Sequence, residues 1–270
     1  MLCYARSGGT LLNQCLGSLP DTVVMSEVNP LGGGGGEPGA VPCRTVRKQA
    51  EHWYGIPLSE NGFGKTIEEL ETYCASVGKT LIVRDWSYVN FAPVEENGYS
   101  PPLEFLTLRE IPTSVDVVPF AFVRDAIDVW ISRDMPEPAD FFSNYLSYVK
   151  KILELDIPIF KYEEFCTDPA NTLKAICAAV GLEFSDITNS YMKFRNVNGD
   201  IQIRSRGQAR PEIRPLQRRK ISRTSVRRLE NSEAMVECNK LLGYSPKYSG
   251  GLLGIRRLYK VLSKLELNTR

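Results

Sequence analysis

The first 27 residues constrain the fold more than any other stretch, because a strand-like run, a small-residue loop and a helical pattern follow one another. Residues 2–5 are apolar and predict a strand, which the sequence Arg6-Ser7-Gly8-Gly9-Thr10 ends. Apolar residues then recur at helical spacing, at Leu11, Leu12, Cys15, Leu16 and Leu19. In such an arrangement the loop N–H groups and the positive end of the helix point at one place, which is typical of an anion site. An ordinary glycine turn is the alternative.

The side chains of this loop favour the anion site. Arg6 supplies a permanent cation whose fork of donors fits phosphate or sulfate oxygens. Gly8 and Gly9 allow the backbone to approach a ligand closely. We expect Ser7 or Thr10 to cap the helix or to bond a ligand oxygen.

Strands and helices are predicted to alternate along the rest of the chain. Apolar runs predict strands over 21–26, 80–83, 115–123 and 157–162, and helical patterns cover 46–54, 66–77, 139–155, 169–180 and 223–242. We therefore expect an α/β fold in which helices cover a parallel sheet. The length of 270 residues suits one large domain over 1–246, followed by a basic amphipathic helical tail over 247–270.

The distribution of charge is more informative than the net charge of +1. Residues 204–228 carry ten Lys or Arg and one acid, so this segment is +9 and the rest of the chain is −8. A basic segment on an otherwise acidic protein favours a local anion site over a nucleic-acid-binding surface.

Cysteine and histidine content predicts the compartment and argues against a metal site. The seven cysteines are odd in number, widely spaced and without a CxxC pair, which favours buried thiols in a reducing cytoplasm. A single histidine, His52, makes a His-based metal centre improbable, and we expect no metal. The sequence shows no signal peptide and no run of transmembrane length, so we expect no integral membrane segment.

Charged and hydroxyl side chains follow two of the predicted strands. Arg84, Asp85 and Ser87 come after strand 80–83, where ligands gather in open α/β sheets. An Arg84–Asp85 ion pair at the strand end is the alternative. Arg124 follows strand 115–123, and Ser132 lies eight residues further on in the next helix, so that both side chains are expected to bind one phosphate.

A third basic segment, Ser205-Arg206-Gly207, suits an anion or, alternatively, a solvated surface. Three separated anion sites predict a ligand with two phosphate-like groups. The sequences Gly64-Lys65-Thr66 and Gly78-Lys79-Thr80 lack the earlier glycine of a Walker A motif, and a clear magnesium aspartate is absent. These absences argue against an ATPase or a kinase.

The three anion-binding segments together resemble the sulfotransferase family, in the branch whose loop reads RSGTTLL. Residues 6–12 are similar to its 5′-phosphosulfate loop, and residues 122–133 to its 3′-phosphate motif. Residues 162–184 and 205–207 are similar to its later YEDL-type segment and its closing basic loop. The resemblance implies a three-layer, P-loop-like parallel sheet with helices on both faces. It also implies transfer of a sulfuryl group from 3′-phosphoadenosine 5′-phosphosulfate to an acceptor hydroxyl or amine.

The resemblance assigns roles to residues of this chain. Arg6 would stabilise charge on the leaving 5′-phosphate, with the Ser7, Gly8, Gly9, Thr10 and Leu11 segment holding the same phosphate. Arg124 and Ser132 would bind the 3′-phosphate, and Arg206 and Gly207 would close over the nucleotide. Glu27 is the expected base, with Asp85 as the alternative.

The chain departs from the family pattern at two loop positions. Gly9 replaces the usual threonine, and Leu11 stands where cytosolic members carry an adenine-stacking tryptophan, so adenine must pack elsewhere.

The sequence leaves the acceptor open. A small molecule, a carbohydrate or a peptide hydroxyl all fit, whereas a nucleic acid does not. A small-molecule kinase or other nucleotide-binding enzyme with a degenerate phosphate loop is one alternative function, and a non-catalytic binding protein on the same fold is another.

Overall fold

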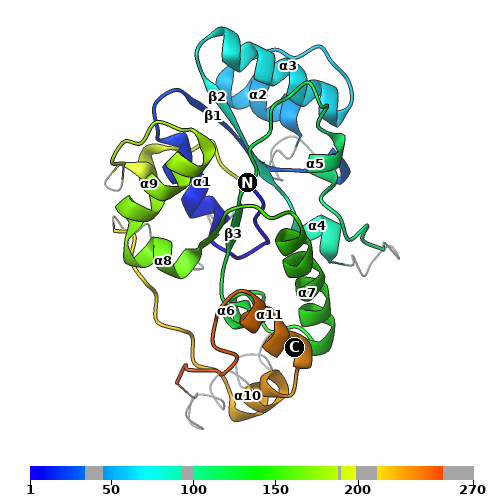
Figure 1. Cartoon of the computed structure of the whole chain (residues 1–270), viewed down its shortest axis with the longest axis vertical. Coiled ribbons are helices and arrows are strands. Elements are labelled where there is room, and N and C mark those ends of the chain that lie inside the picture. Colours follow the sequence, from blue (N-terminus) through cyan, green and yellow to red (C-terminus); the bar gives the residue numbers. More distant parts are fainter. Residues whose placement is uncertain (34–44, 93–99, 188–189, 199–211, 252–270) are drawn as a thin grey trace, which may run out of the picture. The chain divides into compact units, whose positions relative to one another are not determined.

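A computed structural model describes residues 1–33, 45–92, 100–187, 190–198 and 212–251 (Figure 1). It divides into two compact units, the first formed by residues 1–124 and 150–215 and the second by residues 125–149 and 216–270. The described elements are α1 (Gly9–Gly17), β1 (Thr22–Val28), η1 (Pro30–Gly33), α2 (Val46–Tyr54), α3 (Phe63–Ser76), β2 (Thr80–Asp85), α4 (Tyr88–Phe91), α5 (Leu106–Glu110), β3 (Ala121–Val123), α6 (Ala126–Ser132), α7 (Pro138–Glu154), β4 (Ile159–Lys161), α8 (Tyr162–Thr167), α9 (Pro169–Val180), η3 (Tyr191–Lys193), α10 (Arg223–Glu230) and α11 (Glu233–Leu241). The chain is thus mixed α/β, as expected.

The strands of the first unit pair in parallel. Strands β1 and β2 form one pair, and β3 and β4 form another. Leu2 makes parallel bridges to Asp85 of β2 and to Ala121 of β3. The Leu2 N–H donates to the Phe120 carbonyl at 2.9 Å, and the Leu2 carbonyl accepts from the Phe122 N–H at 2.9 Å. The N-terminal segment therefore lies between β2 and β3 and joins the two pairs.

Alternation along β1 divides the apolar side chains of the first unit between two clusters. Val24 packs with residues of α1, α8 and α9, whereas Val23 and Met25 pack with residues of α2 and α3. Because successive strand residues point to opposite faces, the two clusters lie on opposite faces of β1.

Two side chains of α2 satisfy the free edge of β1. The Tyr54 hydroxyl accepts from the Val24 N–H at 3.0 Å and donates to the Val24 carbonyl at 3.1 Å. The Gln49 amide exchanges two 2.7 Å hydrogen bonds with the backbone of Ser26. An edge strand covered in this way is protected from pairing with another chain.

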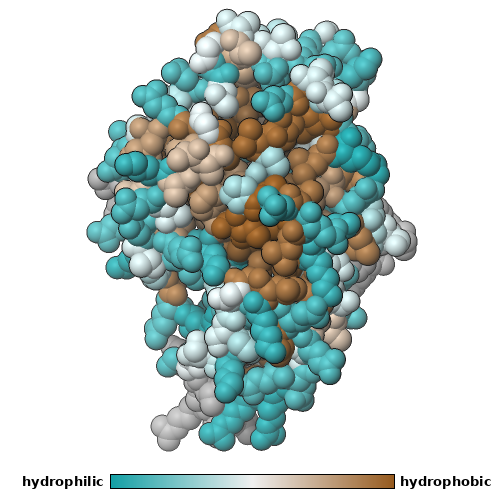
Figure 2. All heavy atoms as spheres, in the orientation of Figure 1, coloured by the Kyte–Doolittle hydropathy of each residue, from teal (hydrophilic) through white to brown (hydrophobic). Residues whose placement is uncertain are grey.

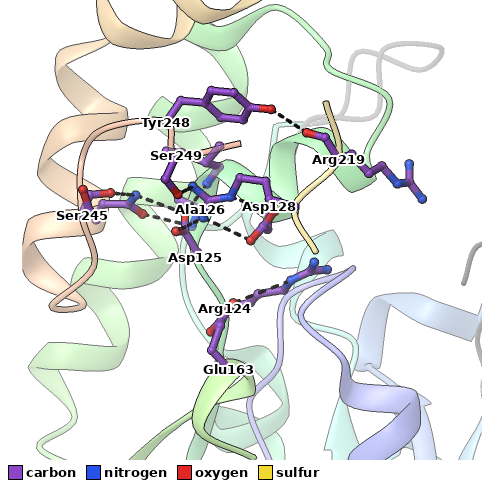
Figure 3. A network of polar contacts seen from close by, with 12 residues as sticks. Arg124, Asp125, Ala126, Asp128, Glu163, Arg219, Ser245, Tyr248 and Ser249 are labelled. Atoms are coloured by element: carbon purple, nitrogen blue, oxygen red, sulfur yellow. Dashed lines mark hydrogen bonds and ion pairs between the residues drawn. The ribbon is translucent and has the colours of Figure 1, made fainter. Parts of the chain in front are cut away.

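The second unit is held by aromatic contacts and by one polar network. The Trp130 and Phe142 rings lie 6.1 Å apart, and α11 packs against both α6 and α10. The network surrounds Asp125, which caps α6 by accepting from the Ile127 N–H at 2.9 Å. Figure 3 shows Asp125 and Asp128 near Ser245 and Ser249.

The structure corrects several of the predicted elements. Of residues 2–5, only Leu2 pairs, through isolated bridges. Residues 115–120 do not form a strand, and only Ala121–Val123 pairs as β3; Val118 is 53% exposed, so this apolar run is not buried throughout. The predicted helix over 223–242 is two helices, because the Ser232 hydroxyl accepts from the Met235 N–H and starts α11. The helix predicted after Asp168 is confirmed, with Asp168 as its N-cap and Gly181 in the left-handed conformation at its end.

Apolar and polar side chains share the surface. Figure 2 shows hydrophobic residues gathered on one face and bordered by hydrophilic ones. Within the described part of the chain, no helix has the length and apolar character needed to cross a membrane. The six described cysteines are all buried and free, as predicted, while Cys43 lies outside the described residues.

Candidate anion site at the strand ends

The polar residues of the first unit gather where its parallel strands end. The loop that starts at Arg6 follows the N-terminal segment, and Glu27 lies near the end of β1. Arg84 and Asp85 end β2, and Arg124 directly follows β3. Because the carboxyl ends of parallel strands share one edge of a sheet, these side chains lie at a common edge.

The loop conformation leaves the start of α1 open to a ligand. Arg6 has φ 72° and Gly8 has φ 90°, and Gly8 is the N-cap of α1. Among the described residues no side chain caps α1, so of the two roles expected for Ser7 or Thr10 the helix cap is not found, and the bond to a ligand oxygen stays a prediction. The Thr10 hydroxyl instead donates to the Asn198 carbonyl at 3.3 Å. The first N–H groups of α1 are therefore available to an anion.

Neither loop glycine has room for a side chain. A Cβ on Gly8 would lie 2.3 Å from a ring carbon of Tyr162. A Cβ on Gly9 would lie 2.6 Å from Arg84 Nε and 2.7 Å from Cys3 Sγ. Gly9 therefore makes room for the Arg84 guanidinium.

Arg84 links the start of α1 to Glu27. Its Nη2 atom donates to Glu27 Oε1 at 3.0 Å, and its Nη1 atom donates to Thr10 Oγ1 at 3.4 Å. The two charged side chains are 4% and 12% exposed. The alternative of an Arg84–Asp85 ion pair is not what the structure shows, because Arg84 pairs with the carboxylate of the neighbouring strand.

The backbone at Glu27 is irregular. The pairing of β1 with β2 shifts register between Met25 and Val28, and Glu27 has φ 53° inside this irregularity. A non-glycine residue in the left-handed region is uncommon, and irregularities of this kind often redirect a side chain at a functional site. Glu27 is thus placed to face the loop across Arg84.

Asp85 occupies a different environment from Glu27. Its Oδ1 atom accepts from Asn29 Nδ2 at 2.8 Å and from Thr107 Oγ1 at 2.5 Å, and its Oδ2 atom accepts from Ser87 Oγ at 2.6 Å. Burial raises the pKa of the Asp85 carboxyl, and the hydrogen bonds from Ser87, Thr107 and Asn29 oppose this effect. Asp85 therefore organises three neighbouring polar side chains, whereas Glu27 makes an ion pair.

Arg124 holds the other side of the loop. Its Nη1 atom donates to the Arg6 carbonyl at 3.1 Å. Its guanidinium lies 4.9 Å from the centre of the Tyr162 ring, and its Nε atom lies 3.9 Å from Glu163 Oε1 (Figure 3). One buried arginine therefore contacts the loop backbone, an aromatic face and a carboxylate.

Three buried donor atoms of this site make no hydrogen bond among the described residues, namely Ser7 Oγ, Arg84 Nε and Arg124 Nε, although Arg124 is bonded through Nη1. Asn13 Oδ1 in α1 is also unpartnered there, but as an acceptor it would not bind an anion. Buried donors are normally satisfied, so unpartnered ones beside a helix N-terminus indicate a place where a ligand oxygen binds.

The remaining predicted site residues are not among the contacts described above. Ser132 is the last residue of α6 and belongs to the second unit, whereas Arg124 belongs to the first. Leu11 packs against the apolar cluster under α1. Arg206 and Gly207 lie outside the described residues.

Sequence reasoning missed the contacts of Arg84 and Tyr162 with the loop glycines. The position of Arg84 directly after an apolar run was a signal for the contact of Arg84 with Gly9. Nothing in the local sequence indicates that the Tyr162 ring packs on Gly8. Within the described residues no cluster of His, Cys, Asp or Glu has the makings of a metal site. Comparisons with known protein families and with curated proteins found no match to this chain, so its function has to be argued from the site itself.

Proposed function

We propose that the protein is a sulfotransferase that moves a sulfuryl group from 3′-phosphoadenosine 5′-phosphosulfate to an acceptor hydroxyl or amine. The observation that carries this proposal is the pair of unpartnered buried donors, Ser7 Oγ and Arg84 Nε, beside the uncapped start of α1. Both donors suit the oxygens of a phosphosulfate group, and the helix N-terminus favours its negative charge.

The strand order supports the finer fold assignment in this proposal. The N-terminal segment lies between β2 and β3, and helices cover both faces of β1. This arrangement is that expected of a three-layer, P-loop-like sheet, in which the loop after the central strand binds phosphate. The loop from Arg6 to Gly9 occupies that position.

The residues at the strand ends suit in-line transfer. Glu27 accepts the proton of the acceptor as the acceptor oxygen forms its bond to sulfur. The bond between sulfur and the 5′-phosphate oxygen breaks, and the bisphosphate product keeps that electron pair. Arg6 and the N–H groups of Gly8 and Gly9 stabilise the charge that develops on the leaving phosphate. Arg84 holds Glu27 in place for the proton transfer.

Recognition of the 3′-phosphate is assigned to Arg124, and the family resemblance implies Ser132 as a second contact. Arg206 and Gly207 are proposed to close over the nucleotide, as the family resemblance implies. Arg124 is buried and already contacts the loop through the Arg6 carbonyl, so one arginine would couple the two phosphate sites. The acceptor is a hydroxyl of a small molecule, a carbohydrate or a peptide.

Calorimetric titration tests the donor assignment. We expect micromolar binding of adenosine 3′,5′-bisphosphate and much weaker binding of 5′-AMP and ATP. Arg124→Ala should weaken bisphosphate binding about 10- to 100-fold, because a charged hydrogen-bonding partner is lost. Arg109→Ala is the matched control, since Arg109 is an exposed arginine that pairs with Glu104 and Glu110.

Other outcomes would favour the other functions. Equal binding of ATP and the bisphosphate would contradict the proposal and favour a kinase-like enzyme. Bisphosphate binding without transfer to any acceptor would favour a non-catalytic binding protein.

A further inference from the structure

The pairing of β3 with β4 brings an acidic side chain next to Arg124. Val123 lies opposite Lys161 in the parallel register, so the residues that follow each strand are neighbours. Arg124 follows β3 directly, and α8 begins at Tyr162 directly after β4. Glu163 therefore lies in the first turn of a helix that starts beside Arg124.

The two partners of this ion pair differ in burial. The distance of 3.9 Å between Arg124 Nε and Glu163 Oε1 is too long for a hydrogen bond. The Arg124 side chain is 10% exposed and is also held by the Arg6 carbonyl and the Tyr162 ring. The Glu163 side chain is 38% exposed. The carboxylate is therefore the more solvent-exposed partner of this ion pair, and the guanidinium is the more buried one.

We propose that Glu163 is an internal competitor for the 3′-phosphate at Arg124. This inference rests on the proposed function and adds to it a residue that limits nucleotide affinity. A phosphate dianion carries more charge than the carboxylate and displaces it from Arg124. The carboxylate returns to Arg124 when the phosphate leaves. Glu163 therefore weakens the binding of the bisphosphate product and speeds its release.

The same helical turn supplies a matched control. Glu164 is the other acidic residue in the first turn of α8, so both carboxylates interact equally with the helix N-terminus. Its side chain is 64% exposed and pairs with Lys161 Nζ at 3.8 Å. Glu163→Gln and Glu164→Gln therefore remove the same charge from adjacent positions, but only the first removes it from Arg124.

Calorimetry and stopped-flow measurements with adenosine 3′,5′-bisphosphate test this role. Glu163→Gln should bind the bisphosphate about three- to ten-fold more tightly than the wild type, mainly through slower dissociation. Its affinity for 5′-AMP, which lacks the 3′-phosphate, should stay the same. Glu164→Gln should change neither affinity. Glu163→Ala should reproduce the gain, because it also removes the carboxylate; a gain confined to Glu163→Gln would mean that the glutamine itself makes a new contact and would overturn the inference.

A double-mutant cycle assigns the effect to Arg124. In an Arg124→Ala background, Glu163→Gln should give no gain in bisphosphate affinity, because the guanidinium for which the carboxylate and the phosphate compete is absent. Equal gains for the bisphosphate and 5′-AMP, or equal gains in Glu163→Gln and Glu164→Gln, would overturn this inference alone. Failure of the wild type to bind the bisphosphate would overturn the proposed function and this inference together.

Discussion

Arg84 in the first unit is buried and Arg218 in the second is partly buried, and the two show how the same side chain serves different purposes. In the second unit, Arg218 donates to Asp125 and Asp128 and also to Ser249 Oγ at 3.3 Å. Its Nε atom donates to Asp128 Oδ1 at 3.2 Å, so both ends of the guanidinium are occupied. In the first unit, Arg84 has one carboxylate partner and an unpartnered Nε atom within the described residues. A closed network stabilises the fold, whereas an open one is available to a ligand.

The open network consists of Arg84, Glu27 and Thr10. A substitution in this network should have the largest effect on activity. Glu27→Gln should lower sulfuryl transfer about 10²–10⁴-fold, because the amide cannot accept the acceptor proton. Bisphosphate affinity should stay close to that of the wild type, since Glu27 is proposed to act on the acceptor and not on the nucleotide. Initial rates with a responsive acceptor and calorimetry measure the two effects, and Glu51→Gln on α2 is the control. Equal loss of binding and of rate would show that Glu27 holds the site together rather than acting as its base.

The closed network consists of Arg218, Asp125, Asp128 and Ser249. A substitution in this network should have the largest effect on stability. Arg218→Ala leaves Asp125 and Asp128 without their shared cation, so the free energy of unfolding should fall by about 3 kcal/mol. Denaturant unfolding followed by tryptophan fluorescence measures this change, because Trp130 lies in the same unit. Arg223→Ala on the exposed side of α10 should have little effect. A loss of similar size in both variants would remove the distinction between closed and open networks.

A substitution at Gly9 should disturb the open network without removing a charge. Gly9→Ala places a methyl group 2.6 Å from Arg84 Nε, so the guanidinium must move and stability should fall by about 1–3 kcal/mol. Bisphosphate affinity should fall as well. In an Arg84→Ala background, Gly9→Ala should cost less, because much of the clash disappears. An equal cost in both backgrounds would point to the Cys3 thiol or to the helix backbone instead.

The smallest expected effect is the contribution of Asp85 to the pH dependence of the free energy of unfolding. Burial raises its pKa, so the native state holds this proton at pH values where the unfolded chain has lost it. The free energy of unfolding should therefore fall as pH rises from the ordinary pKa through the raised one. Asp85→Asn has no carboxyl proton to lose, so its free energy of unfolding should lack this decrease. The difference in free energy of unfolding between the variant and the wild type should therefore shift in favour of the variant as pH rises from the ordinary pKa to the raised pKa. Chemical unfolding at several pH values tests this, with exposed Asp116→Asn as the control.

The sequence predicted local structure well and long-range contacts poorly. The helix over 46–54 and the start of α9 were predicted closely, since periodicity and capping are local signals. The strand end at residue 83 was placed two residues early, because β2 continues through Arg84 and Asp85. The partner of Arg84 and the reason for Gly9 were not predictable, because both depend on packing between distant segments: Arg84 and Glu27 are 57 residues apart, and Arg84 and Gly9 are 75 residues apart.

The central claim is that the open donors beside α1 bind the phosphate groups of the nucleotide, and amide NMR tests it most directly. On titration with adenosine 3′,5′-bisphosphate, the largest ¹H–¹⁵N shifts should occur at Ser7, Gly8 and Gly9. Gly55 and Gly181, which end α2 and α9, should move little. Saturable binding that leaves the Ser7, Gly8 and Gly9 amides unshifted would contradict the account.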